Sequence, residues 1–437
     1  MLASMEQDLR EILRAGLEAA DPKEAVRRTL SVEGGRVKAG GEVFEPERVF
    51  VLSVGKAAVA MAEAAEELLG DGLAGGLVIA KDDGNDEGGL EHLEVLFASH
   101  PEPDERGVEA ARRVEELLDS LGEGDLLLAL VSGGASALLA DVAPEIGLED
   151  LKGLTQSLLR SGAAIGEINT IRKHVSTLKG GGLVRRAAPG TVAGLLLSDV
   201  VGDEPSSIAS GLTAPDPTTL EDAKRVIREY GIEPPESVDA RLDGTEETPK
   251  PGDEIFEGVL NLVIGGGRLS AVAATEKARE LGYDPLLLST YLTGDARDVA
   301  LTYAAIVREA LESGNPLMPP CAIVSGGEAT VVVRGEGTGG PNQEFALALA
   351  TYLDGIGGWG AFAVDTDGTD GPTDAAGGLV SGKTAEDIRA SGIDPGGALA
   401  ENDAYNALKA ADALVVTGPT GTNVNDLRVA LIRGEGE

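Results

Sequence analysis

The strongest constraint on the fold is an alternation of short apolar runs with amphipathic segments, which repeats along nearly all of the 437 residues. Residues 48–54 (RVFVLSV) precede an Ala-rich helical pattern over 56–69, and residues 125–131 (DLLLALV) follow another over 104–121. Strands that alternate with helices form largely parallel sheets with helices on their faces. The sequence therefore predicts an α/β fold.

A composition break divides the alternation into two parts. Residues 233–258 are rich in Pro, Asp and Glu and lack a periodic apolar pattern, which indicates a linker. The alternation resumes with LNLVIGG at 260–266. We expect a Rossmann-like domain over 1–240 and a second α/β domain over 241–437, both with largely parallel sheets.

The net charge limits the partners of the chain. It has 74 Asp and Glu against 36 Lys and Arg, a formal charge of -38, which disfavours nucleic acid and anionic membranes as partners. No apolar run approaches the about 18 residues of a membrane span, and the first residues lack a signal-like core. The single Cys321 excludes an internal disulfide, so we expect a cytoplasmic protein. The 12 Lys against 24 Arg fit either halophile-like salt adaptation or a compositional bias of the lineage.

Two glycine motifs suggest nucleotide binding. Residues 377–384 (GGLVSGKT) match the P-loop pattern, but the nearest expected strand ends at Asp365, so a P-loop is disfavoured. Gly335, Gly337 and Gly340 match a dinucleotide fingerprint after the expected strand TVVVR, which would make the chain an NAD(P)H-dependent reductase. The following helix opens with Pro341 where that fold prefers a small residue, so this reading remains an alternative.

The region from Ile168 to Ser198 contains no Asp or Glu, although the chain is strongly acidic. If residues 168–179 are helical, Asn169, Arg172, Ser176 and Lys179 share one face, and glycines 180–182 end the helix. A cationic face without carboxylates suits an anionic substrate or a nucleotide phosphate. The same cations could instead pair with acidic residues elsewhere.

Carboxylates gather after two expected strands. Ser198, Asp199, Asp203 and Glu204 follow the run 192–197. Four aspartates lie at or just after the later expected strand AFAVD (361–365): Asp365, Asp367, Asp370 and Asp374. Carboxylates suit Mg²⁺, and one of them could accept the proton of an attacking alcohol. Helix capping is the alternative for the first group, and a solvated acidic loop for the second.

Glycine turns at strand ends point to an anion site. LVSGG (130–134), VIGGG (263–267) and IVSGG (323–327) each lead from an apolar run into such a turn, where backbone N–H groups can approach an anion. Lys56 stands at a strand-to-helix turn, which suggests phosphate binding, although it could simply face solvent. Thr422 and Asn423 are candidate polar contacts in the turn TGPTGTN.

Taken together, these segments resemble the class II glycerate kinases, whose chains end in a MOFRL domain. The matching segments are SVGKAA (53–58), VSGGASALL (131–139), NTIRKHVSTLKGGGL (169–183), LSDVVGDEPSSIASGLTAPDPTT (197–219), SGGEATVVVRGEGTGGPNQE (325–344), DTDGTDGPTDAAG (365–377) and TGPTGTNVNDL (417–427). The resemblance implies two α/β domains facing each other across a cleft, with a MOFRL-like region from about residue 320. It also implies phosphorylation of D-glycerate by ATP with Mg²⁺, commonly giving 2-phosphoglycerate.

The resemblance also distributes the candidate residues among roles. The catalytic candidates are Lys56, Asp199 and Arg172. Those for substrate binding are Ser132, Gly133, Gly134, Ser136, Lys173, Lys179 and Ser198. Those for nucleotide binding are Ser325, Gly326, Gly327, Glu328, Asn342, Gln343, Thr422 and Asn423. Those for the metal are Asp199, Asp203, Asp365 and Asp367.

One position departs from the family pattern. Members usually have GGRNQE where this chain has GGPNQE, and the resemblance implies an active-site role for that Arg. Either Arg172, Lys173 or Arg334 replaces its charge at Pro341, or the Arg is not essential. The rival functions are a hydroxypyruvate reductase and an acidic module that binds a small anion or cation. The expected partners are glycerate and ATP, and a homodimer is left open.

Overall fold

The computed structural model describes residues 2–82, 89–244 and 246–433. The described residues form two compact units. The N-terminal unit comprises Pro22–Ser198 and Asp203–Ile264, and the C-terminal unit comprises Met1–Asp21, Asp199–Gly202 and Gly265–Glu437. None of the described helices is both long and apolar enough to cross a membrane.

The N-terminal unit is built on a six-stranded sheet with the order β6-β5-β4-β7-β8-β9. Its strands are β4 (Arg48–Val54), β5 (Leu73–Lys81), β6 (Glu94–Ala98), β7 (Asp125–Val131), β8 (Thr191–Leu197) and β9 (Leu260–Gly265). The pairs from β6 through β8 are parallel. Every residue of β7 is buried, as expected for a central strand with both faces covered.

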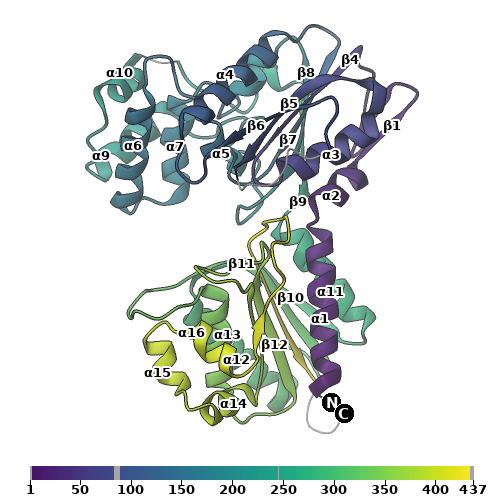
Figure 1. The fold of residues 1–437 in the computed structure, drawn as a ribbon, viewed down its shortest axis with the longest axis vertical. Coiled ribbons are helices and arrows are strands. Elements are labelled where there is room, and N and C mark those ends of the chain that lie inside the picture. Colours follow the sequence, from purple (N-terminus) through teal and green to yellow (C-terminus); the bar gives the residue numbers. More distant parts are fainter. Residues whose placement is uncertain (1, 83–88, 245, 434–437) are drawn as a thin grey trace. The chain divides into compact units, whose positions relative to one another are not determined.

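Helices and a small antiparallel sheet complete this unit (Figure 1). The large sheet is contacted by α3 (Ala58–Leu69), α4 (Glu105–Asp119), α5 (Ala135–Leu138) and α8 (Gly182–Ala187), while α2 (Pro22–Thr29) packs against α3. The small sheet contains β1 (Leu30–Glu33), β2 (Arg36–Ala39) and β3 (Glu42–Phe44). A separate apolar cluster joins α6 (Leu148–Ser161), α7 (Ile165–Val175), α9 (Leu220–Glu229) and α10 (Glu236–Gly244). Asp104 caps α4, since its carboxylate accepts from Gly107 N at 3.2 Å.

The C-terminal unit has a second six-stranded sheet, with the order β10-β11-β15-β12-β13-β14. Its strands are β10 (Asp284–Asp295), β11 (Cys321–Thr330), β12 (Trp359–Asp365), β13 (Gly377–Ser381), β14 (Leu414–Val415) and β15 (Asp426–Ile432). Two apolar clusters cover it. One contains α12 (Ala296–Ser313), α13 (Pro341–Tyr352), α14 (Thr384–Ala390), α15 (Pro395–Ala400) and α16 (Ala404–Ala410). The other contains α1 (Leu2–Ala19) and α11 (Gly267–Glu280), which lie side by side (Figure 1).

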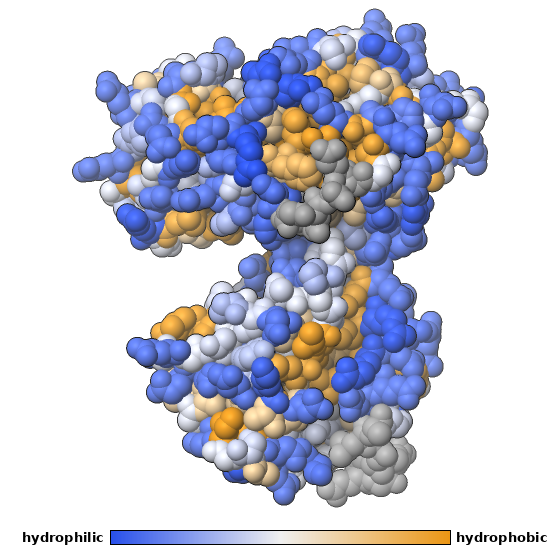
Figure 2. Space-filling model, in the orientation of Figure 1, coloured by the Kyte–Doolittle hydropathy of each residue, from blue (hydrophilic) through white to orange (hydrophobic). Residues whose placement is uncertain are grey.

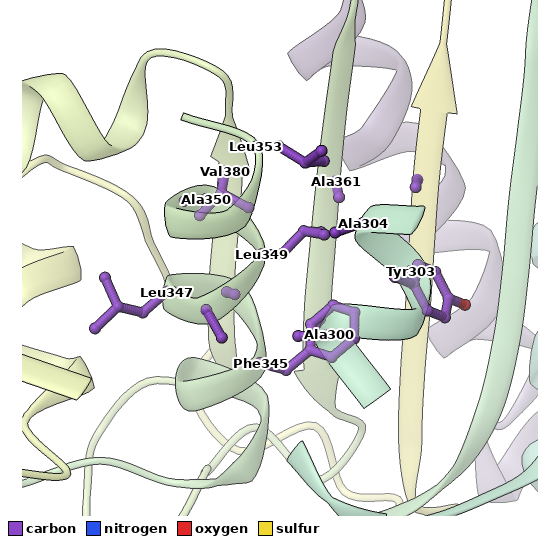
Figure 3. Packing of buried hydrophobic residues seen from close by; sticks show 14 of the residues in the cluster. Ala300, Tyr303, Ala304, Phe345, Leu347, Leu349, Ala350, Leu353, Ala361 and Val380 are labelled. Atoms are coloured by element: carbon purple, nitrogen blue, oxygen red, sulfur yellow. The ribbon is translucent and has the colours of Figure 1, made fainter. Parts of the chain in front are cut away.

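Small residues allow close packing in the first of these clusters. Ala300 and Ala304 of α12 lie near Phe345 and Leu349 of α13 (Figure 3). The rings of Tyr303 and Phe345 meet edge to face, with centroids 5.2 Å apart. An Ala-rich core with few aromatic residues can therefore still be dense.

The predicted α/β class is confirmed, but the two sheets differ. In the C-terminal sheet only β10 and β11 pair in parallel, because β15 inserts between β11 and β12 and runs antiparallel to both. β12 and β13 are antiparallel as well. Periodicity identifies a strand but carries no information on the direction of its neighbour.

Three segments lie on the other side of the expected boundary at 240/241: residues 2–21, 199–202 and 241–264. Met5, Leu9 and Ile12 of α1 are buried against the C-terminal sheet, so the start of the chain belongs to the C-terminal unit. β9 is an edge strand of the N-terminal sheet. The expected linker contains α10, whose Val238 and Leu242 are buried in the helical cluster.

Candidate active site

The first candidate region is the carboxyl edge of the parallel sheet in the N-terminal unit. After β4 and β7 the chain forms two turns that bond to each other: Lys56 N donates to Gly133 O at 2.8 Å, and Ala57 N donates to Ser132 Oγ at 3.1 Å. Gly55 has φ +128°, and a Cβ there would lie 2.2 Å from Ser132 Oγ. The predicted residues Lys56 and Ser132–Gly134 are thus brought together, at the edge where ligands of open α/β sheets bind.

Three basic side chains from different strands lie at this edge. Lys56 follows β4, Lys81 ends β5, and His100 follows β6. Lys56 and Lys81 are exposed and have no ion-pair partner among the described residues. Burial, then the charges of Lys56 and Lys81, lower the pKa of His100 to about 4. The sequence analysis did not select His100 as a site residue. Its position two residues after an apolar strand could have indicated it, because ligands bind at such strand ends.

The cationic segment differs from the predicted continuous helix. α7 ends at Val175, and Ser176 is already extended. Asp141, which is fully buried, accepts from Leu178 N at 3.0 Å and binds both Ser176 Oγ and Lys179 Nζ. This tertiary contact ends the helix before the glycines, so Ser176 and Lys179 do not continue the face of Asn169 and Arg172.

Most cations of this segment form ion pairs with acidic residues elsewhere in the chain, which was the alternative to an anion-binding face. Lys173 Nζ lies 3.1 Å from Asp216 Oδ1, and both side chains are buried. Lys179 pairs with Asp141, and Arg186 with Asp119. Lys173 and Lys179 therefore face carboxylates of their own unit, and their roles in substrate binding remain predictions.

Arg172 is the exception among these neighbours. Its side chain is only partly exposed, and it has neither an ion pair nor a hydrogen bond to any described residue. Burial alone accounts for the lowered pKa of its guanidinium. A dehydrated cation without a counter-charge is costly, and a bound anion would remove this cost.

Hydroxyl groups connect α5 and α7 beside these cations. Ser136 Oγ lies 2.9 Å from Ser210 Oγ, and Ser210 Oγ donates to Asn169 Oδ1 at 3.2 Å. Ser210 has φ +57°, outside the usual range for a residue with a side chain. Ser198 is fully buried at the end of β8. Ser136 and Asn169 thus belong to one polar network.

The second candidate region lies in the C-terminal unit, where β11, β15 and β12 bring acidic residues together. Asp426 is in register with Gly327 on one side and with Asp365 on the other. Burial, then the charge of Asp367, raises the pKa of Asp365 to about 8. Burial likewise raises the pKa of Asp370 to about 7. Loss of hydration, then the charges of Asp426 and Asp199, raises the pKa of the exposed Glu328.

Sequence reasoning missed the pair at the centre of this region, Asp426 and Arg428. Asp426 accepts from Asn342 Nδ2 at 2.6 Å and from Ala329 N at 2.8 Å, and it pairs with Arg428. Arg428 is fully buried, and two of its guanidinium nitrogens lack hydrogen-bond partners in the described chain. Asp426 lies at the end of the matching segment 417–427, and Arg428 lies just beyond it within the apolar strand β15, so the sequence did not single out either residue.

The predicted nucleotide contacts have mixed surroundings. Ser325 is buried and accepts from Tyr303 OH, and Gly327 packs against the backbone of Leu292. Asn342 and Gln343 are buried, and their backbone N–H groups donate to Asp370. The contacts of Ser325, Gly327, Asn342 and Gln343 are thus with other parts of the C-terminal unit. Glu328 is exposed, Asn423 partly so, and Thr422 is buried with no partner for Oγ1.

The structure does not gather the four predicted metal ligands into one group. Asp203 belongs to the N-terminal unit, whereas Asp199, Asp365 and Asp367 belong to the C-terminal unit. Within the described ranges no three His, Cys, Asp or Glu side chains are arranged to hold a metal. Asp365 and Asp367 do suit an ion that takes one or two protein ligands, because their mutual repulsion would be relieved by a cation.

Neither glycine motif forms a nucleotide-binding loop. Residues 377–381 of the P-loop match form β13, which pairs with β12. The motif is therefore itself part of a strand, and not a loop a dozen residues after one as expected. A paired strand cannot wrap around a phosphate. The prediction of a strand over residues 330–334 (TVVVR) is also wrong, because β11 ends at Thr330. A Cβ on Gly335 or Gly337 would lie about 2.5 Å from the Glu401 backbone, so these glycines serve chain packing. Pro341 is the first residue of α13, where its missing N–H has no cost.

Comparison with known proteins identifies both parts of the chain. Residues 8–243 match a domain of unknown function, DUF4147, and residues 321–426 match the MOFRL family. A D-glycerate 2-kinase of Thermotoga maritima is 44% identical over 422 residues, which cover 97% of each chain. A protein of Agrobacterium vitis, provisionally named a hydroxypyruvate reductase, is 43% identical over 98% of this chain and 95% of its own.

A solved structure agrees with these matches. The crystal structure of a glycerate kinase from Thermotoga maritima has a TM-score of 0.89 and 43% sequence identity. The match covers 98% of this chain and 100% of that chain. The similarity therefore extends over both units, beyond the range of either domain family alone.

Proposed function

The chain belongs to the glycerate kinase family that combines these two domains, and we propose that it uses ATP to phosphorylate D-glycerate, giving 2-phosphoglycerate. The full-length similarity to a D-glycerate 2-kinase supports the substrate and the regiochemistry. We place this activity in the cytoplasm, in keeping with the single buried cysteine.

The observation that carries this proposal is the positive charge in the N-terminal unit that has no ion-pair partner among the described residues, on Lys56 after β4 and on Arg172 of α7. In a chain with a formal charge of -38, Lys56 and Arg172 have no carboxylate partner in the described residues. Glycerate and ATP are both anions, so cations without competing carboxylates favour their binding. We assign phosphate binding to Lys56 and substrate binding to Arg172.

The chemistry requires positioning more than covalent assistance. In phosphoryl transfer the acceptor oxygen attacks the γ-phosphorus while the bond to the leaving diphosphate breaks, and catalysis consists mainly of alignment and charge neutralisation. Lys56 would neutralise phosphate charge, and the turn at Ser132–Gly134 would offer polar backbone groups.

Mg²⁺ is the expected metal, and Asp365 and Asp367, with Asp199 as a further candidate, would hold it. The ion would neutralise charge on the phosphates of ATP. The raised pKa of Asp365 is consistent with a site that is completed by a cation.

One experiment tests the proposal. Purified protein is incubated with D-glycerate, ATP and Mg²⁺, ADP formation is followed, and the phosphoglycerate isomer is identified by NMR. We expect ADP formation that depends on glycerate and a product phosphorylated at C2. ADP formation without glycerate dependence would contradict the proposal, and 3-phosphoglycerate would contradict its regiochemistry.

The provisional name of the Agrobacterium vitis relative makes a reductase the second candidate. In the sequence, the reductase hypothesis rests on the dinucleotide fingerprint Gly335, Gly337 and Gly340. These glycines pack against Glu401, Asp403 and Asp370. Oxidation of NADH or NADPH by hydroxypyruvate, measured in the same preparation, would favour the reductase. We expect none.

A further inference from the structure

We propose that His100 is a catalytic residue of the glycerate kinase reaction and accepts the proton of the attacking hydroxyl. In this step the glycerate oxygen forms a bond to the γ-phosphorus of ATP, the bond from that phosphorus to the leaving oxygen of ADP breaks, and the hydroxyl proton moves to a ring nitrogen of His100. This inference rests on the proposed function and adds the identity of the base.

His100 lies beside Lys56 at the turn that follows β7. A Cβ built on Gly134 would lie 3.2 Å from His100 Nε2 and 3.2 Å from Lys56 Cγ, so the imidazole and the lysine border the same space above this glycine. Gly134 has φ +85° and no side chain, which keeps this space open. The imidazole thus adjoins the residues assigned to anion binding.

Both ring nitrogens of His100 are unpaired within the part of the chain that the structure describes. His100 is partly buried, and neither nitrogen has a hydrogen-bond partner among the residues that the structure describes. His174 provides a contrast, because its Nδ1 lies 2.8 Å from Thr170 O and its Nε2 lies 3.4 Å from Glu247. His174 is held in place as a structural residue would be, whereas His100 is free to bond a ligand.

The charges that act on the imidazole of His100 are those of two lysines. The lysines are Lys56 after β4 and Lys81 on β5, and the β7 turn contributes no charge. The nearby acids Asp82 and Asp104 are both paired with Arg106. The free enzyme therefore holds a neutral imidazole, which is the form that can accept a proton. Bound anions would offset the two lysines and raise the pKa of His100 towards the working pH, where a general base is most effective.

The test compares His100→Gln with His92→Gln, an exposed histidine on the same unit that lies beside Glu66. We expect His100→Gln to lower kcat about 100-fold or more, within the usual range for general-base catalysis, while the KM values for glycerate and ATP change far less. His92→Gln should keep the activity of the wild type. His100→Asn and circular dichroism of each variant distinguish loss of a base from loss of folding.

The pH profile gives an independent readout. In the wild type we expect the acid limb of kcat at higher pH than the acid limb of kcat/KM, because kcat reports the complex with bound anions. His100→Gln should lose this limb. The chain has three histidines, so ¹⁵N-histidine NMR of the unmodified protein can follow His100 without relying on a variant. Its signal should move to higher pKa when glycerate and a non-hydrolysable ATP analogue bind.

The outcomes separate the two proposals. If the wild type is active and His100→Gln retains its kcat, or if only KM rises, the base assignment is wrong and the proposed function stands. If the wild type forms no ADP in response to glycerate, both fail. An unchanged His100 NMR signal on substrate binding would also overturn the assignment.

Discussion

Arg172 and Lys173 are adjacent on α7 but have opposite surroundings. Lys173 is buried against Asp216, whereas Arg172 is partly exposed and unpaired among the described residues. Adjacent positions of a helix point about 100° apart, so the side chain of Lys173 is buried while that of Arg172 stays partly exposed. Composition alone could not distinguish these two cations.

Arg172→Ala should weaken substrate binding without affecting the fold. Loss of one charge-assisted hydrogen bond costs about 1.5–3 kcal/mol, roughly 10- to 100-fold in kcat/KM. We expect a higher KM for glycerate or ATP and an unchanged melting temperature. Arg185→Ala, which alters a neighbouring exposed cation, is the matched control. A wild-type KM in Arg172→Ala would return Arg172 to a structural role.

Lys173→Met should instead destabilise the N-terminal unit. It removes the nearest cation of the buried Asp216, whose other basic neighbours, His174 and Lys250, lie 4.0 Å away. Removing one partner of a buried pair costs about 3–5 kcal/mol. Denaturant unfolding followed by circular dichroism measures this loss. The control is Lys224→Met, whose more exposed pair with Asp243 should contribute about 1 kcal/mol or less. Equal effects of the two variants would show that burial of the pair is unimportant.

Asp365 should make the stability of the C-terminal unit fall with rising pH. Its pKa is about 8 in the folded chain and 3.8 as the ordinary value, so between these pH values the folded state binds the additional proton. Folding is then favoured at low pH, and this advantage is lost as pH rises towards 8. Thermal unfolding followed by fluorescence of Trp359, the one tryptophan, tests this. Asp365→Asn should flatten the pH dependence of stability, and Mg²⁺ should stabilise the wild type at pH 8. If the pH dependence is unchanged in Asp365→Asn, another group causes it.

At the scale of elements, α13 carries much of the packing in the C-terminal unit. Phe345, Leu347, Leu349 and Leu353 are all buried in the cluster around it (Figure 3). Its first turn meanwhile donates backbone hydrogen bonds to Asp370. The helix thereby connects the core to the acidic loop of the candidate site.

Leu349→Ala should lower the free energy of unfolding of this unit by about 2–5 kcal/mol, because it removes buried methyl groups and leaves a cavity. Leu349 is fully buried, whereas Leu301 on α12 is 54% exposed. Leu301→Ala is therefore the control and should change little. Chemical denaturation followed by Trp359 fluorescence reports on the correct unit. Similar losses in both variants would mean that the core has rearranged around position 349.

The elements also show where sequence patterns stop being informative. The helical pattern over 104–121 became α4, with Asp104 as its cap. The pattern over 168–179 did not remain helical to its glycines, because Asp141, about 35 residues earlier in the chain, binds the segment after Val175. Local periodicity describes one segment and cannot contain such a distant partner.

For the molecule as a whole, the net charge of -38 predicts a dependence on salt. Hydrophilic residues cover most of the face drawn in Figure 2. Like charges on such a surface repel one another, and the screening length falls from about 10 Å at 0.1 M salt to about 3 Å at 1 M.

We therefore expect KCl to raise both the melting temperature and the activity up to molar concentrations. An equimolar series in a neutral osmolyte controls for effects other than screening. Full activity and stability without added salt would contradict salt adaptation and favour a compositional bias.

The sequence by itself determined the α/β class, the glycine turns after β4 and β7, and the family, because apolar periodicity and ordered motifs are local properties of the chain. Tertiary structure alone decided that β15 runs antiparallel between β11 and β12 and that α1 packs on the C-terminal sheet. It also decided that Lys173 is paired with a carboxylate, whereas Arg172 has no such partner among the described residues. It also brought His100 beside Lys56 and Asp426 beside Asp365. These contacts join residues that are tens of positions apart, and their free energies depend on burial and counter-charges that appear only when the chain is folded.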